Sequence, residues 1–160
     1  MIRNRGARGY TLIEVLVVVV IVGIAAGTIG LGFRGAQARA VRFESERLAL
    51  LIQAAQEESL LRNEPLVLRL DRASYAFLSL DSEGHYVPMK DDLLNRHAFP
   101  SGISIENVAI EGQSASDSAQ INFSQIGEHP AFQLTLRDDK NRWTVDCAAN
   151  GQIKTGPANA

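Results

Sequence analysis

The sequence is poor in cysteine, histidine and aromatic residues, and its charge is nearly balanced. One Cys and 3 His among 160 residues leave no disulfide framework and too few ligands for a Cys-rich zinc module. The 16 Lys and Arg stand against 18 Asp and Glu, so the formal charge is −2. This balance excludes a strongly basic protein that binds nucleic acid through bulk charge. The composition fits one average domain, but the apolar residues are unevenly distributed.

Charge is missing altogether from residues 15–33, close to the N-terminus. A helix of this length, at about 1.5 Å per residue, spans just under about 30 Å, the thickness of a hydrocarbon core. Three arginines in residues 1–9 are of the kind that stays on the cytoplasmic side of a membrane. Three more arginines follow the run by residue 42, so charge bias alone orients it weakly. The run is long enough to cross a membrane.

Two ordinary interpretations of this run compete. A secretory signal peptide has a basic start, an apolar core of roughly 7–15 residues and a small-residue cleavage site, which residues 36–38 resemble. The run is too long for that class, Arg34 interrupts the approach to the site, and Glu14 stands in the apolar register. A plain one-pass anchor is the stronger alternative, but it too must explain the acid.

Glu14 is the informative residue of the N-terminal segment. An ionised carboxylate in the bilayer interior costs about 2.5–3.5 kcal/mol, so such an acid calls for a cationic partner. No Lys or Arg lies within a helical turn on its C-terminal side. Cleavage after Gly9 would create an α-amino group at Tyr10, four residues before the carboxylate. The sequence itself therefore offers a cation of the right kind.

The hexapeptide Gly-Tyr-Thr-Leu-Ile-Glu at residues 9–14, between a short basic leader and an apolar run, resembles the class III signal of type IV pilins and type II secretion pseudopilins. The resemblance implies that a membrane prepilin peptidase cuts after Gly9 and methylates the new N-terminus at Tyr10. It also implies that Glu14 meets the N-terminal amine of a neighbouring subunit during filament assembly. The physical requirement for a cation and the family's assembly role point to the same residue.

Residues 34–62 are predicted to continue the helix, which should end before Pro65 because a residue preceding proline leaves the helical region. At about 100° per residue, two apolar stripes run along it. The first comprises Val41, Leu48, Leu51, Ile52 and Ala55, and the second comprises Phe43, Leu50, Ala54 and Leu61. One stripe would dock on the chain's own head and the other on helices of neighbouring subunits. The alternative is that both are buried in a single fold.

From Pro65 onward the pattern changes to short alternating runs of the kind that form half-buried strands. Strands are expected at residues 66–70, 75–80, 103–110, 121–123, 132–136, 143–147 and 152–155, with a turn at 81–84, a loop at 112–118 and a hairpin at Asn150-Gly151. The fold class is therefore α+β, with a long N-terminal hydrophobic helix packed on a mostly antiparallel β-sheet or β-sandwich head.

The sequence of the head narrows the resemblance to one group within the pilin and pseudopilin families. Residues 47–59, residues 62–68 and the hairpin at 143–153 resemble the H-type minor pseudopilins of type II secretion. This implies a structural part and not an enzyme. It would join other minor pseudopilins at the tip of a periplasmic pseudopilus above the major pseudopilin, help to start assembly, and support export of folded proteins across the outer membrane. Residues 1–9 would be the removed leader, 10–62 the helix and 63–160 the periplasmic head of a single-pass inner-membrane protein.

No residue pattern predicts a catalytic, cofactor-binding or metal site. His85, His97 and His129 have no ligand spacing and are interpreted as satisfied surface histidines. The Asp pairs at 91–92 and 138–139 lack a calcium-loop pattern and fit solvated turns. Cys147 is expected to be a small buried hydrophobe, with an intermolecular disulfide as the alternative.

Two other functions stay open at the level of sequence. One is a membrane-anchored periplasmic binding module or enzyme with a single helix. The other is a minor pilin of a type IV pilus, active in pilus assembly or DNA uptake. Residues 63–160 contain 8 Lys and Arg against 13 Asp and Glu, a formal charge of −5, so no nucleic-acid partner is expected. Removal of residues 1–9 would likewise leave the mature chain with 13 basic and 18 acidic residues.

Overall fold

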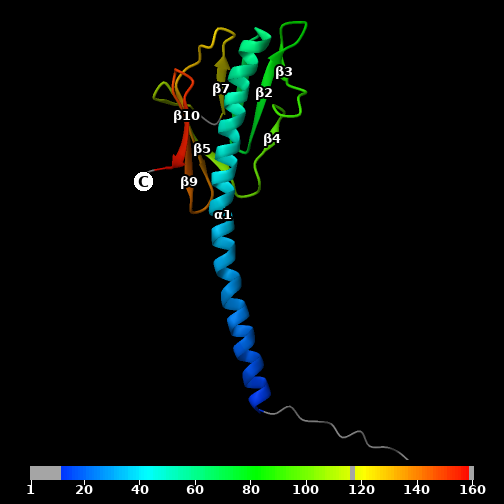
Figure 1. The fold of residues 1–160 in the computed structure, drawn as a ribbon, viewed down its shortest axis with the longest axis vertical. Helices are drawn as coiled ribbons and strands as arrows, with labels where there is room; N and C mark the ends of the chain where they lie inside the picture. Colours follow the sequence, from blue (N-terminus) through cyan, green and yellow to red (C-terminus); the bar gives the residue numbers. More distant parts are fainter. Residues whose placement is uncertain (1–11, 116–117, 159–160) are drawn as a thin grey trace, which may run out of the picture. The chain divides into compact units, whose positions relative to one another are not determined.

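The structure is a computed structural model that describes residues 12–115 and 118–158, without the side chains of residues 25–38. It divides by contacts into two units, residues 1–36 and residues 37–160. Helix α1, Leu12–Arg62, begins in the first unit and ends in the second (Figure 1). The part of α1 from residue 37 to residue 62 therefore packs as part of the head.

The C-terminal end of α1 is where the sequence predicts it. Arg62 is the last helical residue, and a basic side chain there interacts favourably with the helix dipole. Asn63 has a φ of 53°, the left-handed conformation that commonly ends helices. The Glu64 N–H donates to the Ser59 carbonyl at 3.2 Å, which satisfies one of the last free carbonyls of the helix. Pro65 then directs the chain into the first strand.

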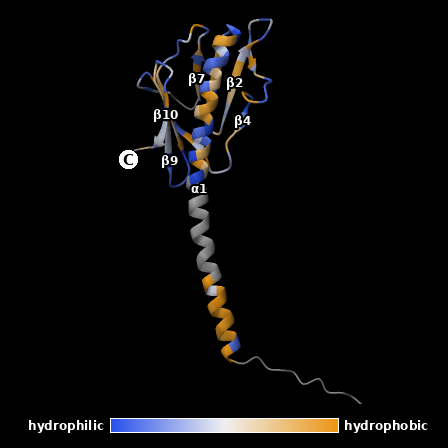
Figure 2. Ribbon diagram, viewed as in Figure 1, coloured by the Kyte–Doolittle hydropathy of each residue, from blue (hydrophilic) through white to orange (hydrophobic). Residues whose placement is uncertain are grey.

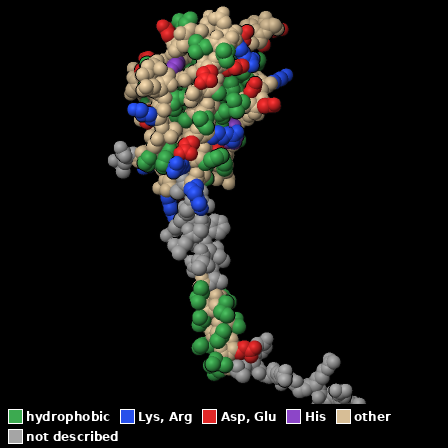
Figure 3. Space-filling model, viewed as in Figure 1, with side chains coloured by type: hydrophobic (Ala, Val, Ile, Leu, Met, Phe, Trp, Pro, Cys, Tyr) green, Lys and Arg blue, Asp and Glu red, His purple; other side chains and the backbone are tan. Residues whose placement is uncertain are grey.

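In the first unit, every described side chain of α1 from residue 12 to residue 24 is exposed. Apart from Gly23, the exposed residues of this stretch are apolar, with one acidic group in the first turn, Glu14; one face of it is seen in Figures 2 and 3. Within the residues described, no helix is both long and apolar enough to cross a membrane. The uncharged run predicted from sequence extends to residue 33, and the side chains of its second part lie outside the described set.

The head contains two antiparallel five-stranded sheets. The first runs in the order β3-β2-β1-β7, with β4 also paired to β2, and the second runs in the order β10-β9-β8-β5-β6. The first sheet consists of β1 Leu66–Asp71, β2 Ser74–Leu80, β3 Tyr86–Pro88, β4 His97–Ala98 and β7 Ser118–Phe123. The second consists of β5 Ser104–Ile110, β6 Gln113–Ala115, β8 Phe132–Arg137, β9 Arg142–Cys147 and β10 Ile153–Pro157.

One apolar core joins the helix to both sheets. Alternate residues of β1 and β7 face this core from the first sheet, and alternate residues of β8 and β9 face it from the second. The first stripe of α1 fills the space between them. This arrangement confirms the predicted α+β class, because the period-two strands bury one face against a period-3.6 helix.

The predicted loop at residues 112–118 is wrong in part, because it contains β6. Glu111 and Gly112 both have positive φ, 49° and 79°, which is the requirement of a tight type I′ turn. The turn folds Gln113 back against Ile110 and makes a short hairpin of β5 and β6. The serine-rich composition of residues 112–118 is typical of a loop, so this strand was not predicted. The three-residue β3 and the two-residue β4 were also not predicted.

The other strands match their predictions to within a few residues at the ends. The Asn150-Gly151 segment does join a hairpin, β9 to β10, with Gly151 at a φ of 84°. The turn is wider than two residues, since the Ala148 N–H donates to the Gln152 carbonyl at 2.9 Å. The last strand extends to Pro157 and forms the edge of its sheet.

Candidate assembly surface

The three residues singled out in the N-terminal motif fall differently on the structure. Gly9 and Tyr10 lie outside the described residues. Glu14 lies in the first turn of α1, exposed between Ile13 and Val15, which are 70% and 53% exposed. No described residue forms a hydrogen bond or ion pair with the Glu14 carboxylate. The pairing of Glu14 with an amine at Tyr10 therefore stays a prediction.

In the head, α1 has two sides of opposite environment. The predicted first stripe is buried, with all five residues at most 5% exposed: Val41, Leu48, Leu51, Ile52 and Ala55. These side chains contact the inner faces of both sheets. At about 25 cal/mol per Å² of apolar surface, their burial is a principal reason that the helix is fixed to the sheets.

The second stripe is exposed. Phe43 is 64% exposed, Leu50 67% and Leu61 82%, while Ala54 is half-buried. At about 100° per residue these four positions lie within an arc of about 40° on the helix. The alternative that both stripes are buried inside one fold is therefore wrong. The head leaves a narrow apolar line along α1 in contact with solvent.

Charged residues border this exposed stripe and are paired along the helix. Arg42 donates to Glu46 at 2.7 Å, and Arg62 contacts Glu58 one turn apart in the same way. The hydrogen bond with Glu58 raises the pKa of Arg62. On one side, a groove of about 350 Å³ separates α1 from β10, lined by Glu46, Ala49, Leu50, Gln53, Ile153 and Thr155. An apolar line between charged flanks is typical of a helix that packs against another helix.

A polar cluster fastens the buried side of α1 to the first sheet. His97 Nε2 lies 3.0 Å from Glu44 Oε2 and 3.3 Å from Arg47 Nη1. Glu44 is only 5% exposed, and the ring of Tyr75 lies 5.3 Å from that of His97. Burial raises the pKa of Tyr75 to about 12, against the lowering effect of the nearby Arg47 cation. The interpretation of His97 as a surface histidine is wrong, because β4 places its ring beside the helix.

A second polar contact joins the end of α1 to the second sheet. The Gln56 amide lies 3.0 Å from His129 Nε2 and donates to Cys147 Sγ at 3.4 Å. His129 is thus half-buried, and the surface interpretation fails for it as well, whereas the His85 side chain is 73% exposed. Cys147 is 3% exposed, as expected, and burial raises the pKa of its thiol.

The aspartates that could have held a metal cap turns instead. The Asp91 carboxylate accepts hydrogen bonds from the Leu93 and Leu94 N–H groups at 2.8 and 3.1 Å, and these bonds lower its pKa. Burial opposes ionisation of Asp138, but hydrogen bonds from Lys140 and Asn141 outweigh it and lower the pKa. In the described part of the chain, no three His, Cys, Asp or Glu side chains converge as metal ligands.

Comparison with known proteins relates both ends of the chain to secretion proteins. Residues 4–30 match the prokaryotic N-terminal methylation motif, and residues 44–151 match the family described as type II transport protein GspH. The type II secretion system protein H of Pseudomonas aeruginosa is 30% identical over 151 residues, which cover 84% of this chain and 85% of that protein.

Solved structures share the fold. The minor pseudopilin EpsH of the Vibrio cholerae type 2 secretion system superposes with a TM-score of 0.61 at 17% identity, over 74% of this chain and 97% of that one. The solution structure of Escherichia coli GspH gives a TM-score of 0.56 at 14% identity, over 77% and 89% of the two chains. At these identities the likeness concerns the helix and the two-sheet head alone.

Proposed function

The chain belongs to the GspH family of type II transport proteins, and from that premise we propose how its parts serve assembly of a pseudopilus. The chain is a minor pseudopilin of the type II secretion system, a structural protein that assembles with other pseudopilins. The finer proposal is that it lies at the pseudopilus tip, helps to initiate assembly above the major pseudopilin, and supports export of folded proteins across the outer membrane.

The N-terminal motif supports a processing step. A prepilin peptidase would remove residues 1–9 by cutting after Gly9 and would methylate the amine of Tyr10. The uncharged run at 15–33 would then anchor the mature chain, residues 10–62 forming the helix, in inner-membrane lipid with the head, residues 63–160, in the periplasm. Mass spectrometry of the membrane-extracted protein tests this directly. We expect the mass of residues 10–160 plus one methyl group, and an intact chain or one cut at Ala38 would contradict it.

Glu14 is proposed to meet the N-terminal amine of a neighbouring subunit. Its carboxylate is exposed among apolar side chains and has no partner among the described residues. An unpaired carboxylate in lipid is costly, so an ion pair across subunits would favour assembly. We expect Glu14→Ala to leave the processed mass intact and to reduce co-purification with the other pseudopilins. Glu83→Ala, which removes an exposed acid outside α1, is the control; equal loss in both variants would refute the specific pairing.

The observation that carries the assembly proposal is the exposed stripe of α1. The head buries one side of the helix almost completely and leaves Phe43, Leu50 and Leu61 uncovered. Side chains of this kind gain about 1.5–3 kcal/mol each when fully buried, so a neighbouring helix would supply the missing contact. This surface is fit for protein association and offers no chemistry for catalysis.

A further inference from the structure

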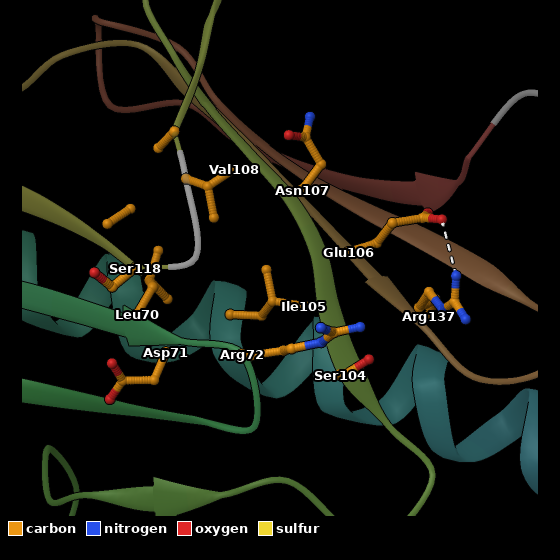
Figure 4. Close-up of a pocket in the computed structure, with 12 residues that line it drawn as sticks. Leu70, Asp71, Arg72, Ser104, Ile105, Glu106, Asn107, Val108, Ser118 and Arg137 are labelled. Carbon is orange, nitrogen blue, oxygen red and sulfur yellow. Dashed lines mark hydrogen bonds and ion pairs between the residues drawn. The ribbon is translucent and has the colours of Figure 1, made fainter.

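Two cavities of the head lie at opposite ends of β7 and differ in charge. At the start of the strand, a cavity of about 280 Å³ opens between β1 and β5 (Figure 4). Its described charged residues are two acids and two arginines, which balance one another: Asp71, Arg72, Glu106 and Arg137. At the other end of β7, a pocket of about 160 Å³ lies between the last turns of α1, the β7–β8 turn and the β9–β10 turn. Glu128 is the charged residue of this pocket, and none of the described residues that line it is Lys or Arg.

Hydrogen bonds within the chain fix the walls of the Glu128 pocket. The β7–β8 turn is closed by the Ser124 N–H, which donates to the Glu128 carbonyl at 3.0 Å, and by the Gly127 N–H, which donates to the Ser124 carbonyl at 3.0 Å. The Ser59 hydroxyl donates to the Gln56 carbonyl of α1 at 2.9 Å and to the Ser124 carbonyl at 3.4 Å, which joins the helix to the turn. The pocket is therefore formed before any partner binds, so little ordering is required on binding.

Two hydrogen-bond acceptors of the Glu128 pocket are unused. The Gln56 amide nitrogen contacts His129 Nε2 at 3.0 Å and Cys147 Sγ at 3.4 Å, whereas Gln56 Oε1 has no hydrogen bond with a described residue. A Cβ at Gly151 would lie 3.8 Å from that oxygen, which places the oxygen beside the β9–β10 turn. The Glu128 carboxylate likewise forms no hydrogen bond or ion pair with any described residue. Two free acceptors, one of them charged, favour a cationic donor.

Exposed apolar side chains flank the Glu128 pocket. Leu60 of α1 is 50% exposed, and its Cδ2 would lie 3.6 Å from a Cβ placed on Gly127. Ile126, the residue before that glycine in the β7–β8 turn, is 71% exposed. Phe123, which also lines the pocket, is 1% exposed. Apolar side chains around one uncompensated acid are typical of a surface that binds protein, where an arginine is a common anchor.

We propose that the Glu128 pocket receives an arginine side chain of a partner protein, and that apolar residues beside this arginine pack on Leu60 and Ile126. The guanidinium binds the Glu128 carboxylate and Gln56 Oε1, because its planar fork of donors can reach two separate acceptors at once. The volume suits one side chain, since pockets that hold small ligands measure roughly 300–1,000 Å³. The occupant is argued from charge complementarity: residues 97–136 contain 4 Asp and Glu and no Lys or Arg. The site does not depend on Glu14, on processing or on the exposed stripe of α1.

The experiment uses the full chain in non-ionic detergent and a fluorescein-labelled peptide, Gly-Leu-Arg-Leu-Gly, followed by fluorescence anisotropy against micelles without protein. We expect saturable binding that weakens at least about tenfold in Glu128→Lys. Asp139→Lys, the same charge change at an exposed residue of the β8–β9 turn, should leave binding unchanged. Glu128→Gln should give a smaller loss, and Ile126→Ser should weaken binding with no change in charge. Far-UV circular dichroism checks that each variant is folded.

Four outcomes would overturn the proposal. The first is no binding up to a thousandfold excess of peptide, and the second is equal weakening by Glu128→Lys and Asp139→Lys, which would indicate bulk charge. The third is equal binding of Gly-Leu-Glu-Leu-Gly, which would exclude recognition of the basic side chain. The fourth is displacement of the peptide by guanidinium chloride or calcium chloride at the same charge concentration, which would reduce the site to an acid that attracts any small cation.

Discussion

The two sides of α1 within the head are made of similar residues and have opposite environments. Leu48 and Ile52 are completely buried, whereas Leu50 and Leu61, on the same helix, are 67% and 82% exposed. Residue type cannot explain the difference, because leucine occurs on both sides. The two sheets have room for one face of the helix, and the other face is left for contacts outside the chain. An apolar pattern therefore predicts that a helix face will be buried. Whether the chain's own sheets or another protein buries it depends on the fold.

The sharpest test of this comparison is a matched pair of leucine truncations. Leu48→Ala should lower the free energy of unfolding by about 2–5 kcal/mol, because it removes buried contacts and leaves a cavity. Leu50→Ala should change it by less than about 0.5 kcal/mol, since its side chain is mostly in solvent. Urea unfolding of the full chain in detergent, followed by circular dichroism, measures both. Equal losses would show that the exposed side also holds the head together.

The reactivity of Cys147 on β9 measures how tightly the buried side of α1 is packed. Its thiol is 3% exposed, contacts Gln56 of α1, and has a pKa raised by burial, so alkylation at pH 8 requires the head to open. Where reclosing is fast, the rate follows the opening free energy, and a loss of about 3 kcal/mol speeds alkylation by about a hundredfold. We expect that acceleration with iodoacetamide in Leu48→Ala and no acceleration in Leu50→Ala. An equally fast reaction in the unmutated chain would contradict the close packing of α1 on β9.

Substitutions in the exposed stripe should weaken assembly with other pseudopilins and leave folding unchanged. Leu50→Glu combined with Leu61→Glu places two charges on the face proposed to meet a neighbouring helix. We expect circular dichroism and urea midpoints close to those of the unmutated chain, with roughly tenfold less co-purification with the other pseudopilins, equivalent to about 1.4 kcal/mol. Ser82→Glu with Asn95→Glu, which adds the same two charges at exposed positions outside α1, is the control. Undiminished co-purification would contradict the proposal that the stripe contacts a neighbouring helix.

The sequence was sufficient wherever local chemistry decides. Pro65 and Asn63 set the end of α1, alternation set the central strands, and the hexapeptide at 9–14 indicated the family. It was insufficient where distant residues meet. Glu44 and His97 are 53 residues apart, and only the pairing of β4 with β2 brings the histidine ring to the helix. Strand β6 could not be predicted either, because it depends on the positive φ angles of Glu111 and Gly112, and the serine-rich composition of the segment indicates a loop.

The smallest expected effect concerns the charges beside the stripe. Arg42 and Glu46 form an exposed pair one helical turn apart, with side chains 59% and 41% exposed, so Coulomb attraction there is largely screened by water. Glu46→Gln should cost only about 0.2–0.5 kcal/mol in urea unfolding, and the difference should vanish in about 1 M NaCl, where the Debye length is roughly 3 Å. Arg42 would keep its position over the Trp143 ring, 5.7 Å from the centroid. A loss above about 1 kcal/mol would mean that the groove between α1 and β10 contributes to the fold, and the division of α1 into a folding side and an assembly side would have to be redrawn.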